Sequence, residues 1–338
     1  MLSSRHGPPM RARLTALGAH VPSRIVTNAD LEQQVDTTDE WIVTRTGIRE
    51  RRWAAPEEAT SDLAVAAAQQ VLHTAGLDAA EVDVFIVPTC TPDHIFPSVS
   101  ALAAHRIGAV NAAAFDIQAA CSGFIYGLAQ ATALVESGLA RNVLVVGAEV
   151  LSRFMDMNDR GTCVLFGDGA AGALITGVPA DGTEGFMGFE LGADGSQAYD
   201  LQVPVGGTRH PASMPFAADE AYIKMNGREV FRFATRVMEE SVLRLLERTG
   251  VGIDEVDLLV AHQANQRIID HAVKKLGIAE DRVFNNLDRY GNTSAASIPL
   301  ALTEAREAGV LTPGALLLLV GFGAGLTWAS CLVRYEPE

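Results

Sequence analysis

The sequence has few cysteines and no long apolar run, and each shortage argues against a class of protein. It has four cysteines in 338 residues, with no CxxC pair and no spacing typical of metal ligands, so neither a disulfide framework nor a zinc site is expected. Such a sparse set of thiols is typical of the reducing cytoplasm, where we expect the protein to be found. The longest apolar run near the C-terminus, Ala315 to Val320, is too short to cross a membrane.

The sequence also has few basic residues relative to acidic ones. The chain has 26 Lys and Arg against 41 Asp and Glu, which gives a net charge of −15. This balance argues against general nucleic-acid binding, which needs a basic surface. An acidic protein partner would need a local basic patch. With 48% hydrophobic residues, however, the chain can bury a large core.

The N-terminal residues lack the continuous apolar stretch of a secretory signal. The chain starts with MLSSRHGPPM, and we expect residues 1–10 to be a flexible leader. Met10 is an alternative to Met1 as the initiator, and the sequence does not decide between the two.

What the sequence does contain is an internal repeat. The stretch at 74–89 resembles the stretch at 248–263, and each follows a helical pattern. Downstream, 136–149 pairs with 307–323 at an offset of about 171 residues. The agreement over successive elements indicates that the chain consists of two similar halves.

The repeat also relates two polar positions. Residues 120–135 align with residues 291–306, so that Cys121 and Asn292 occupy equivalent points of the two halves. Each is expected at a junction between a loop and a helix.

Each half alternates short apolar runs with helical patterns, which is typical of parallel strands covered on both faces. We therefore predict a duplicated α/β fold with an N-terminal half at 11–180 and a C-terminal half at 181–338. The halves are expected to form five layers, αβαβα, about a pseudo-dyad. Helices 120–135 and 291–306 are apolar nearly all round, which predicts burial between the two sheets. The segment 181–220, rich in Gly, Pro and Asp, is expected to be a connector with turns.

Cys121 is the first candidate for chemistry. It follows a strand-like run and comes just before a helix, whose dipole and free N–H groups favour a thiolate. We therefore expect a lowered thiol pKa and a nucleophilic role. The small neighbours Ala120, Ser122 and Gly123 leave room for a substrate carbonyl. The alternative is an ordinary buried cysteine, which is the commoner fate of this residue type.

His262 and Asn292 are the next candidates. His262 follows the buried strand VDLLVA, at the kind of strand end where α/β folds gather reactive groups. A lone His there is more often structural, but the sequence HQAN places three polar side chains together. Asn292 begins a helix, and taken alone it is typical of an N-cap or a turn.

The segment GFGAGL at 321–326 follows the last apolar strand. Its glycine spacing does not match a nucleotide-binding loop. Glycines allow close backbone approach, so a better use is to direct a backbone N–H at a developing oxyanion. A tight turn at the strand end is the structural alternative.

A Cys–His–Asn set invites comparison with papain-like peptidases. The separation of 141 residues between Cys121 and His262 lies inside their range. The surroundings of Cys121, QAACSGF, lack the peptidase signature, and the duplicated α/β pattern also disagrees. We therefore set this alternative aside.

The chain instead resembles β-ketoacyl-acyl-carrier-protein synthase III, the initiating condensing enzyme of bacterial fatty-acid synthesis in the thiolase-like superfamily. The resemblance extends from about residue 11 to 335. The stretches that carry it are 36–52 (DTTDEWIVTRTGIRERR), 119–128 (AACSGFIYGL), 159–173 (DRGTCVLFGDGAAGA), 262–268 (HQANQRI), 288–302 (DRYGNTSAASIPLAL) and 321–328 (GFGAGLTW).

The resemblance implies a catalytic triad of Cys121, His262 and Asn292, and an oxyanion hole made by the backbone N–H groups of Cys121 and Ala324. Elongating synthases and thiolases are similar in fold but use Cys–His–His or Cys–His–Cys sets. Where many members carry three glycines in the last loop, this chain has Gly323-Ala324-Gly325. The N–H of Ala324 remains able to donate.

The resemblance also implies the substrates and their contacts. It implies a ping-pong condensation of an acyl-coenzyme A, with acetyl expected, and malonyl-acyl carrier protein, with no metal or other cofactor. Coenzyme A contacts are expected at Trp41, Arg45, Arg160, Gly227, Phe231, Ala264 and Asn265. Carrier-protein contacts are expected at Arg232, Gln263, Ala264, Asn265, Gln266, Arg267, Lys274 and Lys275.

Phe96 matches a family position that reaches across a homodimer interface into the partner's acyl pocket. A bulky Phe there favours short primers. Two alternatives of the same fold stay open, namely a condensing enzyme of secondary metabolism and an acyltransferase that does not decarboxylate.

Overall fold

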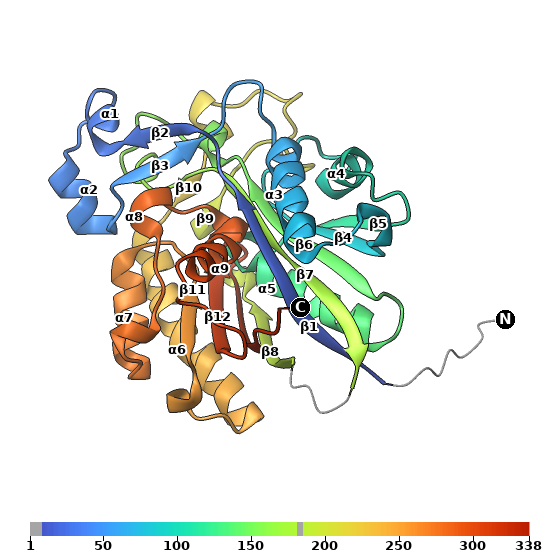
Figure 1. Cartoon of the computed structure of the whole chain (residues 1–338). Helices are drawn as coiled ribbons and strands as arrows, with labels where there is room; N and C mark the ends of the chain where they lie inside the picture. The colour runs from blue at the N-terminus through green and yellow to red at the C-terminus, as the bar shows by residue number, and fades with distance from the viewer. Residues whose placement is uncertain (1–8, 181–184, 338) are drawn as a thin grey trace.

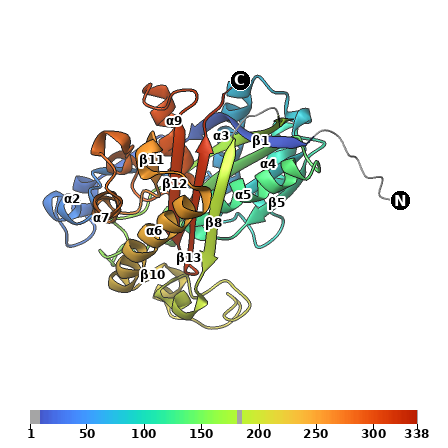
Figure 2. The same cartoon turned by 90° about the horizontal axis from the view of Figure 1, so that it is seen from below.

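A computed structural model describes residues 9–180 and 185–337, which form two large β-sheets with helices between and outside them and two smaller two-stranded sheets (Figures 1 and 2). The expected leader, residues 1–10, falls almost entirely outside the described residues, but Met10 already pairs with Pro179 in the first sheet. In the described ranges, no helix combines the length and the apolar character needed to span a bilayer.

The first sheet belongs to the N-terminal half. Its strands, in spatial order, are β1 (Met10–His20), β7 (Gly169–Pro179), β6 (Asn142–Glu149), β4 (Val84–Pro88) and β5 (Ala113–Ile117). Strand β4 runs parallel to β5 and β6, whereas β7 is antiparallel to β1 and β6. All residues of β4 and β6 are buried, as expected for strands covered on both faces.

The second sheet repeats this arrangement. Its order is β11 (Leu258–Ala261), β12 (Leu316–Gly323), β13 (Thr327–Arg334) and β8 (Phe186–Ala193). On β11, Leu259 forms an isolated parallel bridge with Val283, at the place that β5 takes beside β4 in the first sheet. Strand β8 lies inside the segment 181–220, so the expectation of a mere connector was wrong there. Its pairing with β13 is a long-range contact that local composition does not reveal.

Helices complete the layers. Between the sheets lie α5 (Gly123–Glu136) and α9 (Ser297–Glu307). The outer face of the first sheet carries α3 (Thr60–Ala75) and α4 (Val99–Ile107), and that of the second carries α6 (Gly227–Thr249) and α7 (Gln266–Leu276). The predicted five-layer duplicated α/β fold, with α5 and α9 buried between the sheets, is therefore confirmed.

Smaller elements cover the ends of the sheets. One apolar cluster includes an antiparallel strand pair and the two short helices that connect its strands, namely β2 (Arg24–Thr27), α1 (Asn28–Glu32), α2 (Asp39–Thr46) and β3 (Glu50–Trp53). The other short segments are α8 (Leu287–Tyr290), β9 (Leu201–Gln202), β10 (Lys224–Met225) and the 3-10 turns η1 (Ala79–Glu81), η2 (Ala120–Ser122), η3 (Leu151–Phe154), η4 (Gly195–Asp200), η5 (Ala218–Ala221), η6 (Ile253–Glu255), η7 (Glu280–Arg282) and η8 (Ser294–Ala296).

The central parallel strands of the two halves correspond at an offset of 174 residues. Strands β4 and β11 begin at 84 and 258, and β6 and β12 begin at 142 and 316, a difference of 174 in both cases. The offset of about 171 predicted from the sequence holds only where the inner helices end. Helix α5 has 14 residues and α9 has 11, so the glycines that follow them, Gly138 and Gly309, are 171 apart.

The same comparison corrects the expected equivalence of Cys121 and Asn292. The two turns that precede the inner helices both begin with a left-handed residue, Ala120 with φ 46° and Ser294 with φ 48°. These residues are 174 apart, so the position equivalent to Cys121 is Ala295. Asn292 lies three residues before that point, and the sequence alignment missed the shift because α9 is shorter by nearly one turn.

Candidate active site

Cys121 lies in the middle of the η2 turn, directly before α5. The preceding residue, Ala120, has a left-handed φ of 46°, a conformation that L-residues adopt at a cost. The end of β12 packs against this turn. A Cβ built on Gly323 would lie 2.6 Å from the backbone nitrogen of Cys121, so only glycine fits there.

His262 follows β11 and is 1% exposed. Its Nδ1 lies 2.7 Å from Ser297 Oγ, and its ring meets the edge of Phe322 at a centroid distance of 5.4 Å. Ser297 Oγ also accepts the backbone N–H of Gln263 (3.4 Å), so this serine holds the ring at Nδ1 and leaves Nε2 as the nitrogen free to serve the cavity. Burial lowers the pKa of His262 to about 3, so the imidazole is neutral.

Asn292 is held by its backbone and by its side chain. Its N–H donates to Leu165 O (2.8 Å) and its carbonyl accepts from Gly167 N–H (3.0 Å). Its side-chain Oδ1 accepts the backbone N–H of Ser294 (2.9 Å). Because the oxygen must face that N–H, the amide Nδ2 is the group left to donate into the cavity.

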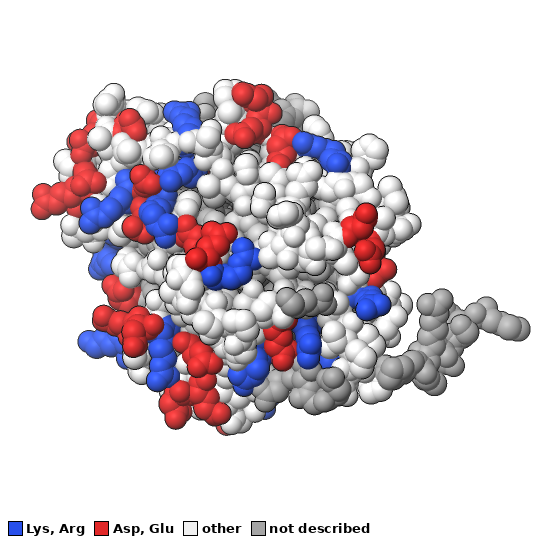
Figure 3. Space-filling model, in the orientation of Figure 1, with Lys and Arg blue, Asp and Glu red and all other residues white. Residues whose placement is uncertain are grey.

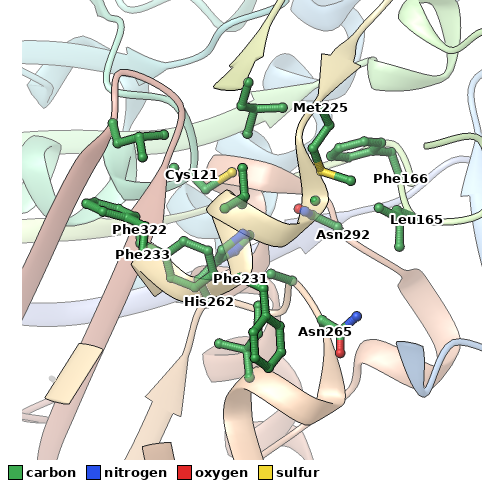
Figure 4. Close-up of a pocket in the computed structure, with 17 residues that line it drawn as sticks. Cys121, Leu165, Phe166, Met225, Phe231, Phe233, His262, Asn265, Asn292 and Phe322 are labelled. Atoms are coloured by element: carbon green, nitrogen blue, oxygen red, sulfur yellow. The ribbon is translucent and has the colours of Figure 1, made fainter. Parts of the chain in front are cut away.

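The three side chains line one cavity, although they come from three separate segments (Figure 4). Figure 4 shows Cys121, His262 and Asn292 around the same space, with aromatic and aliphatic side chains forming the walls. Such a cavity suits an apolar acyl chain and excludes water from the polar groups at its base.

The expectation of a lowered Cys121 pKa was wrong. Burial, with a smaller effect of the nearby Glu149, raises the pKa of the Cys121 thiol to about 12, although a hydrogen bond from Ser294 acts in the opposite direction. Loss of water around the sulfur outweighs the hydrogen bonds that favour the thiolate. The resting site therefore holds a thiol beside a neutral imidazole.

The residues expected at coenzyme A lie together. The Trp41 ring on α2 has the guanidinium of Arg160 at 5.2 Å and that of Arg45 at 5.8 Å from its centre. Asn265 Nδ2 donates to Arg45 O (3.0 Å), and Asn265 also lines the cavity. The remaining expected residues, Gly227, Phe231 and Ala264, line the cavity as well.

Most residues expected at the carrier protein lie on α6 and α7. Arg232 is exposed and pairs with Glu229 at 2.7 Å, and the guanidinium of Arg267 lies 5.7 Å from the centre of the Phe231 ring. Lys274 and Lys275 are in the last turn of α7. On the face shown in Figure 3, charged side chains of both signs gather over the side where α2, α6 and α7 lie.

Gln263 does not fit that surface. It is 1% exposed, donates to Ala261 O (2.7 Å) and accepts from the backbone N–H groups of Asn286 and Leu287. Its burial contradicts the expectation that it contacts a carrier protein. Gln266 is half-buried and bonded to Asp270 and Asn285.

Phe96 lies outside the cavity of its own chain. Its side chain is 84% exposed, and that of the adjacent Ile95 is 83% exposed. An exposed apolar pair of this size is unusual on a solvated surface.

Several buried polar residues around the site were not singled out from the sequence. Glu149, Ser294 and Ser297 hold the catalytic segments by hydrogen bonds. Glu149 was detectable in principle, because a charged residue ends the otherwise apolar strand NVLVVGAE. Within the described part of the chain, no cluster of three or more His, Cys, Asp or Glu side chains is suited to hold a metal ion.

Comparisons with known proteins agree with this geometry. Family models described as 3-oxoacyl-[acyl-carrier-protein (ACP)] synthase III match residues 115–195 and, for the C-terminal part, 246–335. The β-ketoacyl-[acyl-carrier-protein] synthase III of Desulfitobacterium hafniense is 50% identical over 96% of this chain and 98% of its own length.

Solved structures are equally similar. The synthase III of Thermus thermophilus is 50% identical, with a TM-score of 0.89 over 96% of this chain and all of the other. The priming β-ketosynthase of the R1128 polyketide pathway is 36% identical, with a TM-score of 0.89 over 99% of this chain and all of the other.

Proposed function

Because the chain belongs to the β-ketoacyl-[acyl-carrier-protein] synthase III family, the initiating condensing enzymes of fatty-acid synthesis, we propose that it joins an acyl-coenzyme A primer to malonyl-acyl carrier protein. The products are 3-oxoacyl-acyl carrier protein, coenzyme A and CO2. The observation that carries the proposal is that Cys121, His262 and Asn292 line one cavity of the thiolase-like fold.

In the first half-reaction, the Cys121 sulfur attacks the primer thioester and expels coenzyme A, so a new thioester replaces the old one. The thiol proton ends on the coenzyme A sulfur. The tetrahedral oxyanion accepts N–H bonds from Cys121 and Ala324, each worth about 3 kcal/mol in such sites.

In the second half-reaction, the malonyl group loses CO2, and the electron pair of the broken carbon–carbon bond forms an enolate. His262 Nε2 and Asn292 Nδ2 donate to the enolate oxygen. Both nitrogens are left for this task because Ser297 engages Nδ1 and Ser294 engages Oδ1. The enolate carbon then attacks the acyl-Cys121 thioester and breaks its carbon–sulfur bond, and the released Cys121 sulfur takes up a proton from solvent.

The cluster of Trp41, Arg45 and Arg160 is proposed to bind the coenzyme A headgroup. Guanidinium groups suit its phosphates, and the indole suits its adenine. The bond from Asn265 to Arg45 O supports this, because it joins the cluster to the cavity wall through which pantetheine would reach Cys121.

The N-terminal end of α6 and the whole of α7 are proposed to receive the acidic carrier protein. In the described residues, Lys274, Lys275 and Arg267 form no ion pair, and the Arg267 guanidinium lies over the Phe231 ring, so their charges are available to a partner. Arg232 contributes less, since Glu229 already neutralises it. Ala264, Asn265 and Gln266 connect this surface to the cavity.

Phe96 is proposed to be covered by a second copy of the chain and to shorten its acyl pocket, which favours acetyl as primer. The exposure of Phe96 supports this proposal. We further propose a cytoplasmic protein that takes coenzyme A only as a substrate, because N–H donors supply the charge stabilisation that the reaction needs.

The test combines intact-mass analysis with a condensation assay. The wild type should gain the mass of an acetyl group from acetyl-coenzyme A and then form 3-oxoacyl-acyl carrier protein when malonyl-acyl carrier protein is added. Cys121→Ala should do neither, and undiminished acylation of this variant would refute the assignment. A panel of primers also tests the second candidate, priming of a polyketide pathway, which the R1128 relative favours.

A further inference from the structure

Glu149, the last residue of β6, is a buried carboxyl that the proposed mechanism does not use. It is 0% exposed. It accepts hydrogen bonds from Thr91 Oγ1 (2.6 Å), Ser294 Oγ (2.9 Å) and the backbone N–H of Cys90 (3.2 Å). Among the described residues, no Lys, Arg or His forms an ion pair with it. A carboxyl buried without a cation is costly, so a packing role alone does not account for it.

Ser294 connects Glu149 to the active site. Its hydroxyl donates to Glu149 Oε1, and its backbone N–H donates to Asn292 Oδ1 (2.9 Å). The residue has a left-handed φ of 48°, which is unfavourable for serine and must be held by its surroundings. Ser294 therefore links the Glu149 carboxyl to the Asn292 amide, which points into the cavity.

The contact crosses from one half of the molecule to the other. Glu149 ends a strand of the first sheet, whereas Ser294 opens the η8 turn of the second half. The backbones also touch here, since a Cβ on Gly147 would lie 2.4 Å from Ala295 O. The position of the η8 turn thus depends directly on the end of β6.

The two halves can be compared at the point where the end of a central strand meets a turn of the other half. At the offset of 174, Glu149 corresponds to Gly323, and Ser294 corresponds to Ala120. Gly323 lies against the backbone nitrogen of Cys121. Each central strand therefore ends against the catalytic turn of the other half, once with a glycine and once with a carboxyl.

We propose that Glu149 is a positioning residue for Asn292: by holding the Ser294 turn, it keeps Asn292 Oδ1 on the Ser294 N–H and Nδ2 directed at the malonyl thioester. The inference rests on the proposed role of Asn292 in condensation. Loss of the Glu149 carboxyl should then slow the second half-reaction and spare the acylation of Cys121. Burial, which raises the pKa of Glu149, agrees with a group that serves through hydrogen bonds rather than through charge.

The test measures the two half-reactions separately. Acylation is followed by intact mass after mixing with acetyl-coenzyme A, and condensation by single turnover of the isolated acetyl-enzyme with malonyl-acyl carrier protein. Glu149→Ala should slow condensation by about tenfold or more while acylation stays within about threefold of the wild type. Glu149→Gln, which keeps two hydrogen-bonding atoms, should restore condensation to within about threefold.

Asp83→Ala is the matched control. Asp83 accepts the backbone N–H groups of Arg141 (2.7 Å) and Asn142 (2.9 Å) and so anchors the opposite end of β6. It should lower stability without changing the ratio of the two half-reactions. If Glu149→Ala slows both half-reactions equally, or slows neither, the positioning role is wrong.

Ser294→Ala supplies a second approach if Glu149→Ala does not fold. It removes the hydroxyl but keeps the N–H on Asn292, so it should slow condensation by less than Asn292→Ala does. Because the same hydroxyl also bonds the Cys121 thiol, condensation of the isolated acetyl-enzyme is the rate to compare. Where both single variants fold, the double variant should be no slower than Glu149→Ala, because the two groups act through one bond. If the wild type does not condense, the proposed function fails; if Asn292→Ala is selective and Glu149→Ala is not, only the positioning role fails.

Discussion

Gly323 lies so close to Cys121 that a Cβ on the glycine would be 2.6 Å from the cysteine's backbone nitrogen. No side chain fits into that gap. The close approach brings the end of β12 and the following Ala324 beside the nucleophile, which is where an oxyanion would need N–H donors.

Gly323→Ala should therefore impair catalysis out of proportion to its size. The added methyl must displace the η2 turn or β12, which misaligns the oxyanion donors, and we expect acylation by acetyl-coenzyme A to fall by about 10²-fold. The measurement is the rate of acetyl-enzyme formation by intact mass. Gly195→Ala is the control, because a Cβ there meets nothing within 4 Å. Wild-type acylation by Gly323→Ala would contradict the proposed oxyanion site.

Asn292→Ala should separate the two half-reactions. The amide Nδ2 is proposed to stabilise the enolate, so condensation should fall by about 10²-fold or more, while acylation of Cys121 stays within about threefold. The two rates are measured as acetyl-enzyme formation and as single-turnover condensation. Equal loss of both rates would mean that Asn292 supports the fold of the site and not the enolate.

The raised pKa of Cys121 predicts an alkylation rate without a plateau near neutral pH. With a thiol pKa of about 12, the thiolate fraction grows about tenfold for each pH unit throughout the range from pH 6 to 9. The rate at which iodoacetamide modifies Cys121, followed by peptide mass spectrometry, should rise accordingly. A plateau above pH 7 would indicate the lowered pKa that a helix dipole alone predicts.

Reversing the charge of Arg267 should weaken use of the carrier protein alone. We expect Arg267→Glu to lower kcat/KM for malonyl-acyl carrier protein by about tenfold at low salt, and less at high salt, because steering by charge is screened. Acylation by acetyl-coenzyme A should be unchanged. Arg248→Glu is the control, since Arg248 is near the other end of α6 and pairs with Glu190. Equal effects of both variants would place the carrier protein elsewhere.

Much of the fold was predictable because its signals are local and repeated. The apolar runs within β4 and β6 and the apolar helices α5 and α9 predicted strands and helices buried on both sides, and the structure confirms them. Strand β8 was missed because only its first residue, Phe186, is fully buried and because its pairing partner lies more than 130 residues further along the chain.

The sequence was sufficient to predict which three residues form the candidate site, but not their pKa shifts or the burial of their neighbours. Junctions between strands and helices brought Cys121, His262 and Asn292 to one cavity, as the sequence suggested. The direction of the Cys121 pKa shift and the burial of Gln263 depend on atoms contributed from distant segments. The role of Glu149 depends on a hydrogen bond between residues 145 positions apart, which no local pattern reveals.

The central strand of each half packs against a turn of the other half, and this limits how the molecule can be divided. Gly321 of β12 packs on the Cys121 turn, and Gly147 of β6 packs on the Ala295 turn. A fragment cut between the sheets would keep the nucleophile with its helix but lose the backbone that shapes the space around it. Neither fragment would carry a working centre by itself, and activity from a severed chain would require the two pieces to reassemble first.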